Sequence, residues 1–180
     1  MIITQINTVA FGRDNSTLIS AGLDETIRFW DVDRETEVRA IKNPGPVFNA
    51  AVSPNSRYVA ASSYTQTVVY GFDTGEEARR FTIKEPPRGP ASFIWSLTFS
   101  PDSLLLATGM WDDGGIRLFG LEQGQGIWTT PFPHTVMSLA FSHNRKFLLA
   151  GVSPDAPYLL DAETGVILKR YGGATCAFKK

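Results

Sequence analysis

Cysteine and histidine are almost absent from this sequence. Cys176 is the only cysteine in 180 residues, and His134 and His143 are the only histidines. A single cysteine cannot form an internal disulfide or build a cysteine-based metal site. The sequence therefore predicts neither a disulfide framework nor a metal centre, and it is compatible with a reducing compartment.

Long apolar runs and an excess of one charge are also missing. No stretch approaches the roughly 18 consecutive apolar residues of a membrane-spanning helix, and residues 1–5 lack the basic and apolar segments of a signal peptide. The 17 basic and 18 acidic residues nearly cancel, which leaves a formal net charge of -1. This balance argues against strong attraction to nucleic acid or to a membrane surface. We expect a cytoplasmic or nuclear protein that does not bind membranes.

The sequence does contain one short motif in four copies. An apolar, strand-like hexapeptide recurs at residues 6–11, 47–52, 94–99 and 136–141, and each copy leads into a short polar turn. The last apolar residues of the copies are 41, 47 and 42 residues apart. A period of about 40 to 45 residues built from short strands is typical of the blades of a β-propeller.

Each repeat offers four short segments rich in β-branched and aromatic residues, with Gly, Asp and Asn at the turns between them. Helical spacing is nowhere sustained. The prediction is an all-β, propeller-like array of about four four-stranded antiparallel blades, which form one region over residues 1–180. Blades pack on their neighbours because one blade cannot bury its own apolar faces. The blades are predicted at about 5–43, 46–84, 92–131 and 134–172.

The first repeat also carries a family resemblance. Residues 18–32, LISAGLDETIRFWDV, resemble the centre of a WD-repeat blade, with the turn aspartate Asp24 and the pair Trp30 and Asp31. Residues 100–109, SPDSLLLATG, are similar to the first hairpin of such a blade. The other repeats have lost the pair, and we align Gly71, Leu118 and Leu160 with Trp30. The resemblance covers residues 5–173.

A further repeat begins at residues 174–180, because residues 175–178 resemble residues 8–11. WD-repeat rings usually need about seven blades, within a general range of four to eight. Four blades therefore predict an incomplete ring. The chain is a fragment of a longer protein, which we favour, or it forms a homodimer with about eight blades, or it closes as a strained four-blade ring.

The resemblance implies a docking surface for a partner. In WD-repeat propellers the usual docking face carries the turn between the second and third strands and the connection into the next blade. Large apolar residues occupy these positions here, and Trp and Tyr are common interface anchors. Their packing between blades is the alternative. The Pro-rich insertion at residues 84–90 is expected on the same face. The predicted partner-binding residues are Leu23, Phe48, Tyr64, Phe93, Trp95, Trp111 and Met137.

Residues that could carry catalytic chemistry are few. Asp112 and Asp113 are adjacent, whereas acid–base catalysis needs two carboxylates at a fixed separation in different environments, so a turn is the better interpretation. His134 and His143 fall at different points of the repeat, which argues against a shared site. The motifs Gly-x-Ser-x-Gly and Gly-x-Gly-x-x-Gly are missing. We predict no catalytic residue, cofactor or metal ligand.

The predicted function is a non-catalytic scaffold that binds a protein or peptide on the rim face of the propeller. One alternative is a propeller enzyme, which would need polar residues along the central channel. That position instead holds Asn7, Phe48, Trp95 and Met137, which are mostly apolar. The other alternative is a nucleic-acid-binding module, but only Lys84 and Arg88 would provide positive charge near the aromatic residues.

Overall fold

The structure is a computed structural model, and it describes residues 5–84, 93–112 and 114–172. Within these ranges sixteen strands form four four-stranded antiparallel sheets, and there is no helix. Each sheet contains four strands that follow one another in the chain. The predicted all-β class is confirmed. We call the sheets A to D in chain order.

The strands are short, and those of one sheet are joined by tight turns. Sheet A contains β1 (Ile6–Phe11), β2 (Thr17–Gly22), β3 (Thr26–Asp31) and β4 (Thr36–Lys42). Sheet B contains β5 (Asn49–Val52), β6 (Tyr58–Ser62), β7 (Gln66–Gly71) and β8 (Glu77–Thr82). Sheet C contains β9 (Ile94–Phe99), β10 (Leu105–Met110), β11 (Ile116–Gly120) and β12 (Gln125–Thr130). Sheet D contains β13 (Thr135–Phe141), β14 (Phe147–Ser153), β15 (Pro157–Asp161) and β16 (Ile167–Arg170).

A serine builds the first turn of sheets B, C and D in the same way. The hydroxyl oxygens of Ser53, Ser100 and Ser142 each accept the backbone N–H of the residue five positions later, at 2.9 Å. The residue three positions after each serine adopts a positive φ of 53° to 62°. The polar turns that follow each repeated hexapeptide therefore start the second strand at a fixed register.

The hydrophobic core is divided between three joints, A–B, B–C and C–D. Each inner sheet faces two neighbours with alternate residues of its strands, as strand geometry requires. In sheet B, Val59 and Val68 face sheet A, whereas Ala60 and Val69 face sheet C. Apolar residues on both sides of a strand are thus explained by burial on both sides.

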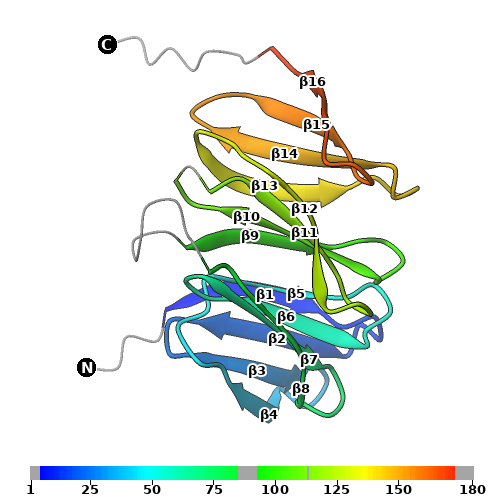
Figure 1. Cartoon of the computed structure of the whole chain (residues 1–180). Coiled ribbons are helices and arrows are strands. Elements are labelled where there is room, and N and C mark those ends of the chain that lie inside the picture. The colour runs from blue at the N-terminus through cyan, green and yellow to red at the C-terminus, as the bar shows by residue number, and fades with distance from the viewer. Residues whose placement is uncertain (1–4, 85–92, 113, 173–180) are drawn as a thin grey trace, which may run out of the picture.

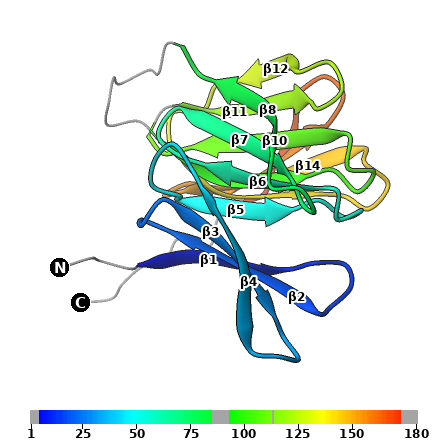
Figure 2. The same ribbon diagram turned by 90° about the horizontal axis from the view of Figure 1, so that it is seen from below.

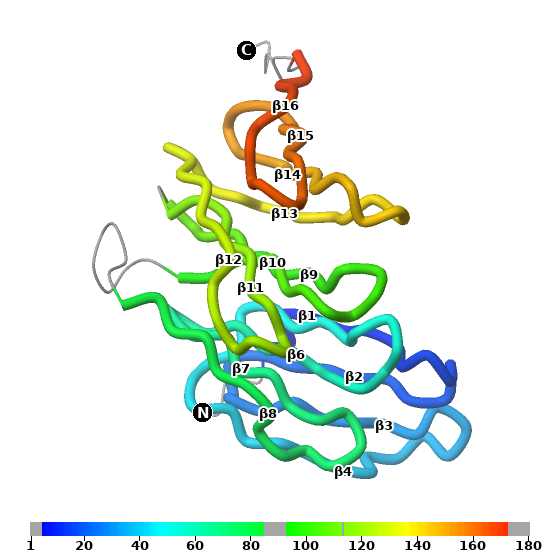
Figure 3. Tube along the Cα trace, turned by 45° about the vertical axis from the view of Figure 1, so that its right-hand side comes forward, coloured from blue at the N-terminus to red at the C-terminus, as the bar shows by residue number. Residues whose placement is uncertain are grey.

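The sheets are arranged in chain order around their first strands. β1 contacts β5, β5 contacts β9 and β9 contacts β13. Sheets A and D lie at opposite ends of the array (Figure 1), and the same order is visible in the chain trace (Figure 3). Seen from below, β5 lies beside β1 (Figure 2). Among the described residues the array is therefore open, like part of a propeller, and sheets A and D each have one face on which no described sheet packs.

The strand register corrects part of the sequence alignment. Leu18 pairs with Trp30, and the equivalent pairs are Val59 with Tyr70 and Leu106 with Phe119. The residues at the Trp30 position are therefore Tyr70 and Phe119, not Gly71 and Leu118. The reason is that the connection between the second and third strands is one residue shorter in sheet B, and one longer in sheet C, than in sheet A.

Three sequence predictions fall partly or wholly outside the described residues. These are the further repeat at 174–180, most of the Pro-rich insertion at 84–90, and Asp113.

Candidate functional site

Five of the seven residues predicted to bind a partner form one continuous cluster of aromatic rings. Phe93 is at its centre. Its ring stacks on Phe48 at a centroid distance of 4.7 Å and on Trp111 at 5.3 Å, with interplanar angles of 30° and 15°. We call Phe48, Tyr64, Phe93, Trp95 and Trp111 the ring cluster.

The other two rings pack edge-on against this stack. The ring centroid of Tyr64 lies 5.4 Å from that of Phe48. The ring centroid of Trp95 lies 5.8 Å from that of Phe93 and 5.3 Å from that of Trp111. Offset-stacked and edge-to-face pairs of this kind contribute roughly 0.5 to 1.5 kcal/mol each beyond the area that they bury. The five rings therefore hold one another in a defined arrangement.

The backbone explains why the cluster forms at one end of sheets B and C. A first strand begins, and a second strand ends, at the same end of an antiparallel sheet. The N–H of Phe48, just before β5, donates to the carbonyl of Ser62 at 3.0 Å. In sheet C the N–H of Trp111, just after β10, donates to the carbonyl of Phe93 at 2.8 Å. The N–H of Ile94 reaches the carbonyl of Tyr64 at 2.9 Å and links the two sheets.

The side chains of the ring cluster are partly exposed to solvent. The side chains of Tyr64 and Trp111 are 50% and 37% exposed, whereas Phe48, Phe93 and Trp95 are partly buried. The rings thus pack against one another between sheets B and C and also offer apolar surface to solvent. Packing between the sheets is thus observed for part of each ring, and the binding of a partner by these residues stays a prediction.

Leu23 and Met137 lie outside the ring pairs. Leu23 is partly buried in the turn between β2 and β3 of sheet A, and Met137 is an exposed residue of β13 in sheet D. They belong to the sheets on either side of the two that carry the ring cluster.

The turn aspartate of sheet A has a structural environment. Asp24 accepts hydrogen bonds from the hydroxyl of Thr26 at 2.7 Å and from the guanidinium of Arg28 at 2.8 Å, and Arg28 also pairs with Glu37 at 3.0 Å. Burial alone would raise the pKa of Asp24, but the hydrogen bonds from Arg28 and Thr26 together outweigh it and lower the pKa below 3.8. Asp24 is therefore a carboxylate that holds the turn.

Side chains suited to metal binding do not converge in the part of the chain that the structure describes. Across residues 5–84, 93–112 and 114–172, no three His, Cys, Asp or Glu side chains gather as metal ligands would. Asp112 lies in a turn with a φ of 54°, and its N–H donates to the hydroxyl of Thr135 at 3.2 Å. The same ranges contain no helix that could span a membrane.

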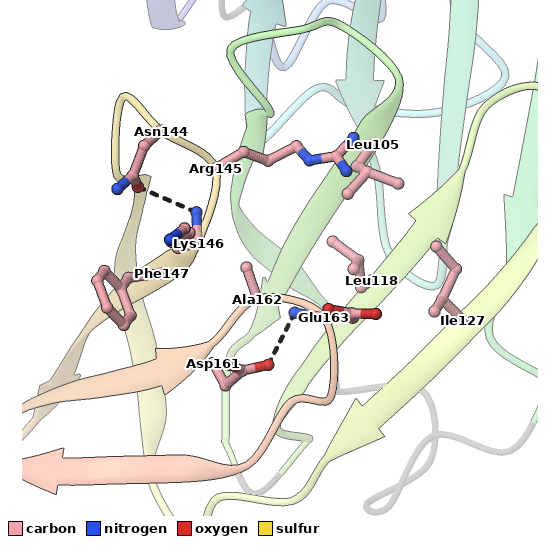
Figure 4. A pocket seen from close by; sticks show the side chains of 10 residues that line it. All are labelled: Leu105, Leu118, Ile127, Asn144, Arg145, Lys146, Phe147, Asp161, Ala162 and Glu163. Atoms are coloured by element: carbon pink, nitrogen blue, oxygen red, sulfur yellow. Dashed lines mark hydrogen bonds between the residues drawn. The ribbon is translucent and has the colours of Figure 1, made fainter.

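A cavity of about 740 Å³ opens between sheets C and D (Figure 4). Leu105 is the first residue of β10 and Trp111 follows the last, so the cavity lies at the end of sheet C opposite the ring cluster. Leu105, Leu118 and Ile127 contribute apolar side chains to its lining. The carboxylate of Asp161 accepts the N–H of Glu163 at 3.0 Å in a turn. Arg145 pairs with Asp102. These polar groups serve the turns and the joint between the sheets, so we assign the cavity no chemistry.

Comparison with known proteins identifies the repeat. The family model described as "WD domain, G-beta repeat" matches residues 4–31 and 82–119. These segments include strands of sheets A and C, and the first contains Asp24, Trp30 and Asp31.

Several curated proteins are similar over most of the chain. Periodic tryptophan protein 2 of Arabidopsis thaliana is 27% identical over 91% of this chain and 18% of its own length. The U3 small nucleolar RNA-associated protein 18 homolog of the same plant is 30% identical over 95% of this chain and 32% of its own length. Small ribosomal subunit protein RACK1 of Schizosaccharomyces pombe is 26% identical over 63% of this chain and 37% of its own length. The chain thus spans between 18% and 37% of the length of these relatives.

Proposed function

Because this chain belongs to the WD-repeat family, we propose that it is a non-catalytic interaction scaffold that docks a protein or peptide partner on the ring cluster. One observation carries the proposal. Five aromatic side chains from two sheets form a single packed group in which Tyr64 and Trp111 stay 50% and 37% exposed. Aromatic anchors in a rigid setting are the usual centres of binding energy in protein interfaces.

The chemistry of the cluster suggests which side chains a partner would insert. Exposed faces of Trp and Tyr rings attract apolar side chains and the cationic groups of Lys and Arg. Leu23 and Met137, on sheets A and D, would extend the contact as apolar flanks. The partner is therefore a peptide segment that presents an apolar or basic anchor residue.

The names of two relatives support an interaction role. One is named as a small ribosomal subunit protein and another as a protein associated with a small nucleolar RNA, so each name joins its protein to other molecules. We extend this to the present chain as a component of a cytoplasmic or nuclear assembly.

The test is a selection of peptide ligands on the purified chain, followed by calorimetric titration of the best peptide. Trp111→Ala and Tyr64→Ala should each weaken binding about tenfold or more. Ile127→Ala is the matched control, because Ile127 is an exposed apolar residue at the cavity on the opposite end of the sheets. The affinity of this variant for the peptide should equal that of the parent chain.

Two results would contradict the proposal. In the first, Trp95→Ala and Trp111→Ala lower the melting temperature but leave peptide affinity unchanged, which would assign the rings to the core. In the second, the chain selects no peptide but binds single-stranded RNA, and Trp111→Ala abolishes that binding. Stacking of bases on the rings would then explain the cluster.

A further inference from the structure

The outward side of sheet A, which we call end face A, exposes residues that the same repeat positions bury in the other sheets. Val9, Phe11 and Val32 are 62%, 58% and 42% exposed. The residues equivalent to Val32 are Phe72, Leu121 and Ala162, and each of them is buried against the preceding sheet. The residues equivalent to Phe11 are Val52, Phe99 and Phe141, of which Phe99 is buried and the other two are partly buried. End face A is thus the second half of a sheet–sheet joint.

The outward side of sheet D, which we call end face D, is the first half of such a joint. Leu149 is 42% exposed there, whereas the equivalent residues Ile19, Ala60 and Ala107 are fully buried against the following sheet. An apolar groove of about 480 Å³ runs over this face. Its lining includes Phe147, Leu149, Pro157, Leu159 and Tyr171.

A hydrogen bond repeats at all three internal joints. A side chain of the fourth strand donates to a backbone carbonyl in the last turn of the following sheet. The donors Arg39, Arg79 and Trp128 occupy one repeat position, and they reach the carbonyls of Phe72, Leu121 and Ala162, the last two at 2.9 and 3.1 Å.

The two end faces carry the missing halves of this contact. In sheet D the donor position is Lys169, which pairs with Leu159 across the strands and is exposed. In sheet A the acceptor position is the carbonyl of Val32, and the next residue is Asp33. The internal joints also have an acidic residue there, Asp73, Glu122 or Glu163. The two end faces are therefore complementary in apolar surface, in hydrogen bonding and in charge.

We propose that end face D of one copy packs on end face A of a second copy, as sheet packs on sheet at each internal joint. Two such joints, related by a two-fold axis, close a ring of eight sheets, which is the upper end of the usual range for propellers. The occupant is a second copy of this chain because both halves of the joint are present in it. The interface is distinct from the ring cluster, so its failure would leave the proposed function standing.

The test is the mass of the purified chain in solution, measured by sedimentation velocity over a dilution series. At about 50 μM the expected mass is twice the 19.8 kDa of one chain, and dilution should return the monomer by mass action. Phe11→Asp and Leu149→Asp should each abolish the pair, because each places a carboxylate in both joints. Leu104→Asp is the matched control, since Leu104 is also a leucine with 42% exposure but lies in a turn of sheet C.

Mixing the two variants tests which face meets which. Phe11→Asp keeps an intact end face D and Leu149→Asp keeps an intact end face A, so the mixture should form a weaker pair through one joint, while neither variant pairs alone. Circular dichroism spectra that match the parent chain would show that both variants fold.

Three results would overturn the proposal. A monomer at every concentration would assign the end faces to sheets of another chain or of further repeats. Loss of pairing with Leu149→Asp but not with Phe11→Asp would mean that like faces meet. A mass well above two copies would show an open chain of joints instead of a closed ring.

Discussion

The three-joint core can be tested with two leucines that occupy the same repeat position. Leu118 pairs with Ala107 in sheet C, and Leu159 pairs with Leu149 in sheet D. Leu118 is buried between sheets C and D, whereas Leu159 lies on end face D and is only partly buried. Substitution of each by alanine therefore removes the same atoms from the equivalent strands β11 and β15, with and without a covering sheet.

The expected costs follow from this difference in burial. Leu118→Ala should lower the free energy of unfolding by about 3 kcal/mol, because it loses apolar burial and leaves a cavity between two packed sheets. Leu159→Ala should cost about 1 kcal/mol, because only one side of its side chain is covered and solvent can fill the space. With a urea dependence of about 2 kcal/mol/M, the first change would move the unfolding midpoint by roughly 1.5 M.

The assay is urea unfolding followed by circular dichroism at about 1 μM chain, because dilution favours the monomer over the proposed pair. Leu104→Ala serves as a control, because this exposed leucine should change the free energy of unfolding by less than about 0.5 kcal/mol. Equal costs for Leu118→Ala and Leu159→Ala would refute the reasoning, because they would mean that end face D is as well covered as an internal joint.

Three further predictions concern turns and close contacts. Asp24→Asn should lower the melting temperature at pH 7, because it removes a carboxylate that is stabilised in the folded chain. The difference in melting temperature from the parent chain should disappear as the pH falls below 3.8 through the lowered native pKa, and an equal difference at about pH 2 would contradict this. Gly109→Ala should cost on the order of 2 kcal/mol in urea unfolding, because a Cβ there would lie 2.5 Å from Val136 Cγ1, whereas Gly172→Ala has open space and should be neutral. Trp30→Phe should cost about 1 kcal/mol in the same assay, because it removes the indole N–H that donates to a serine hydroxyl at 2.9 Å; no loss would show that water replaces the bond.

The ring cluster shows how far the sequence could predict the arrangement of the candidate site. The repeat identified Phe48, Tyr64, Trp95 and Trp111 by their positions at one end of their blades, which follows from strand and turn order alone. It did not predict that Phe93 stands at the centre of the stack, because residues between strands have no periodicity that fixes where their side chains point. The contact of Phe93 with Trp111 depends on the antiparallel pairing of β9 and β10, which brings the residue before β9 next to the residue after β10.

The alignment at Trp30 shows a second limit. A fixed repeat offset placed Gly71 and Leu118 at this position, and each was wrong by one residue. In a strand, a shift of one residue exchanges the two faces, so Leu118 faces sheet D, while Phe119 faces sheet B. Only the pairing of strands reveals that one connecting turn is shorter and another longer.

The sequence by itself determined the number of repeats, the all-β class and the alternation of side chains along each strand. These properties depend on neighbours within about ten residues, where turn residues and strand patterns act locally. The tertiary structure decided which apolar side chains are covered, because the same repeat position is buried where a following sheet packs on it and exposed where none does. Leu149 and Ile19 are equivalent in the repeat, and their difference in burial comes entirely from the sheet that lies beside them.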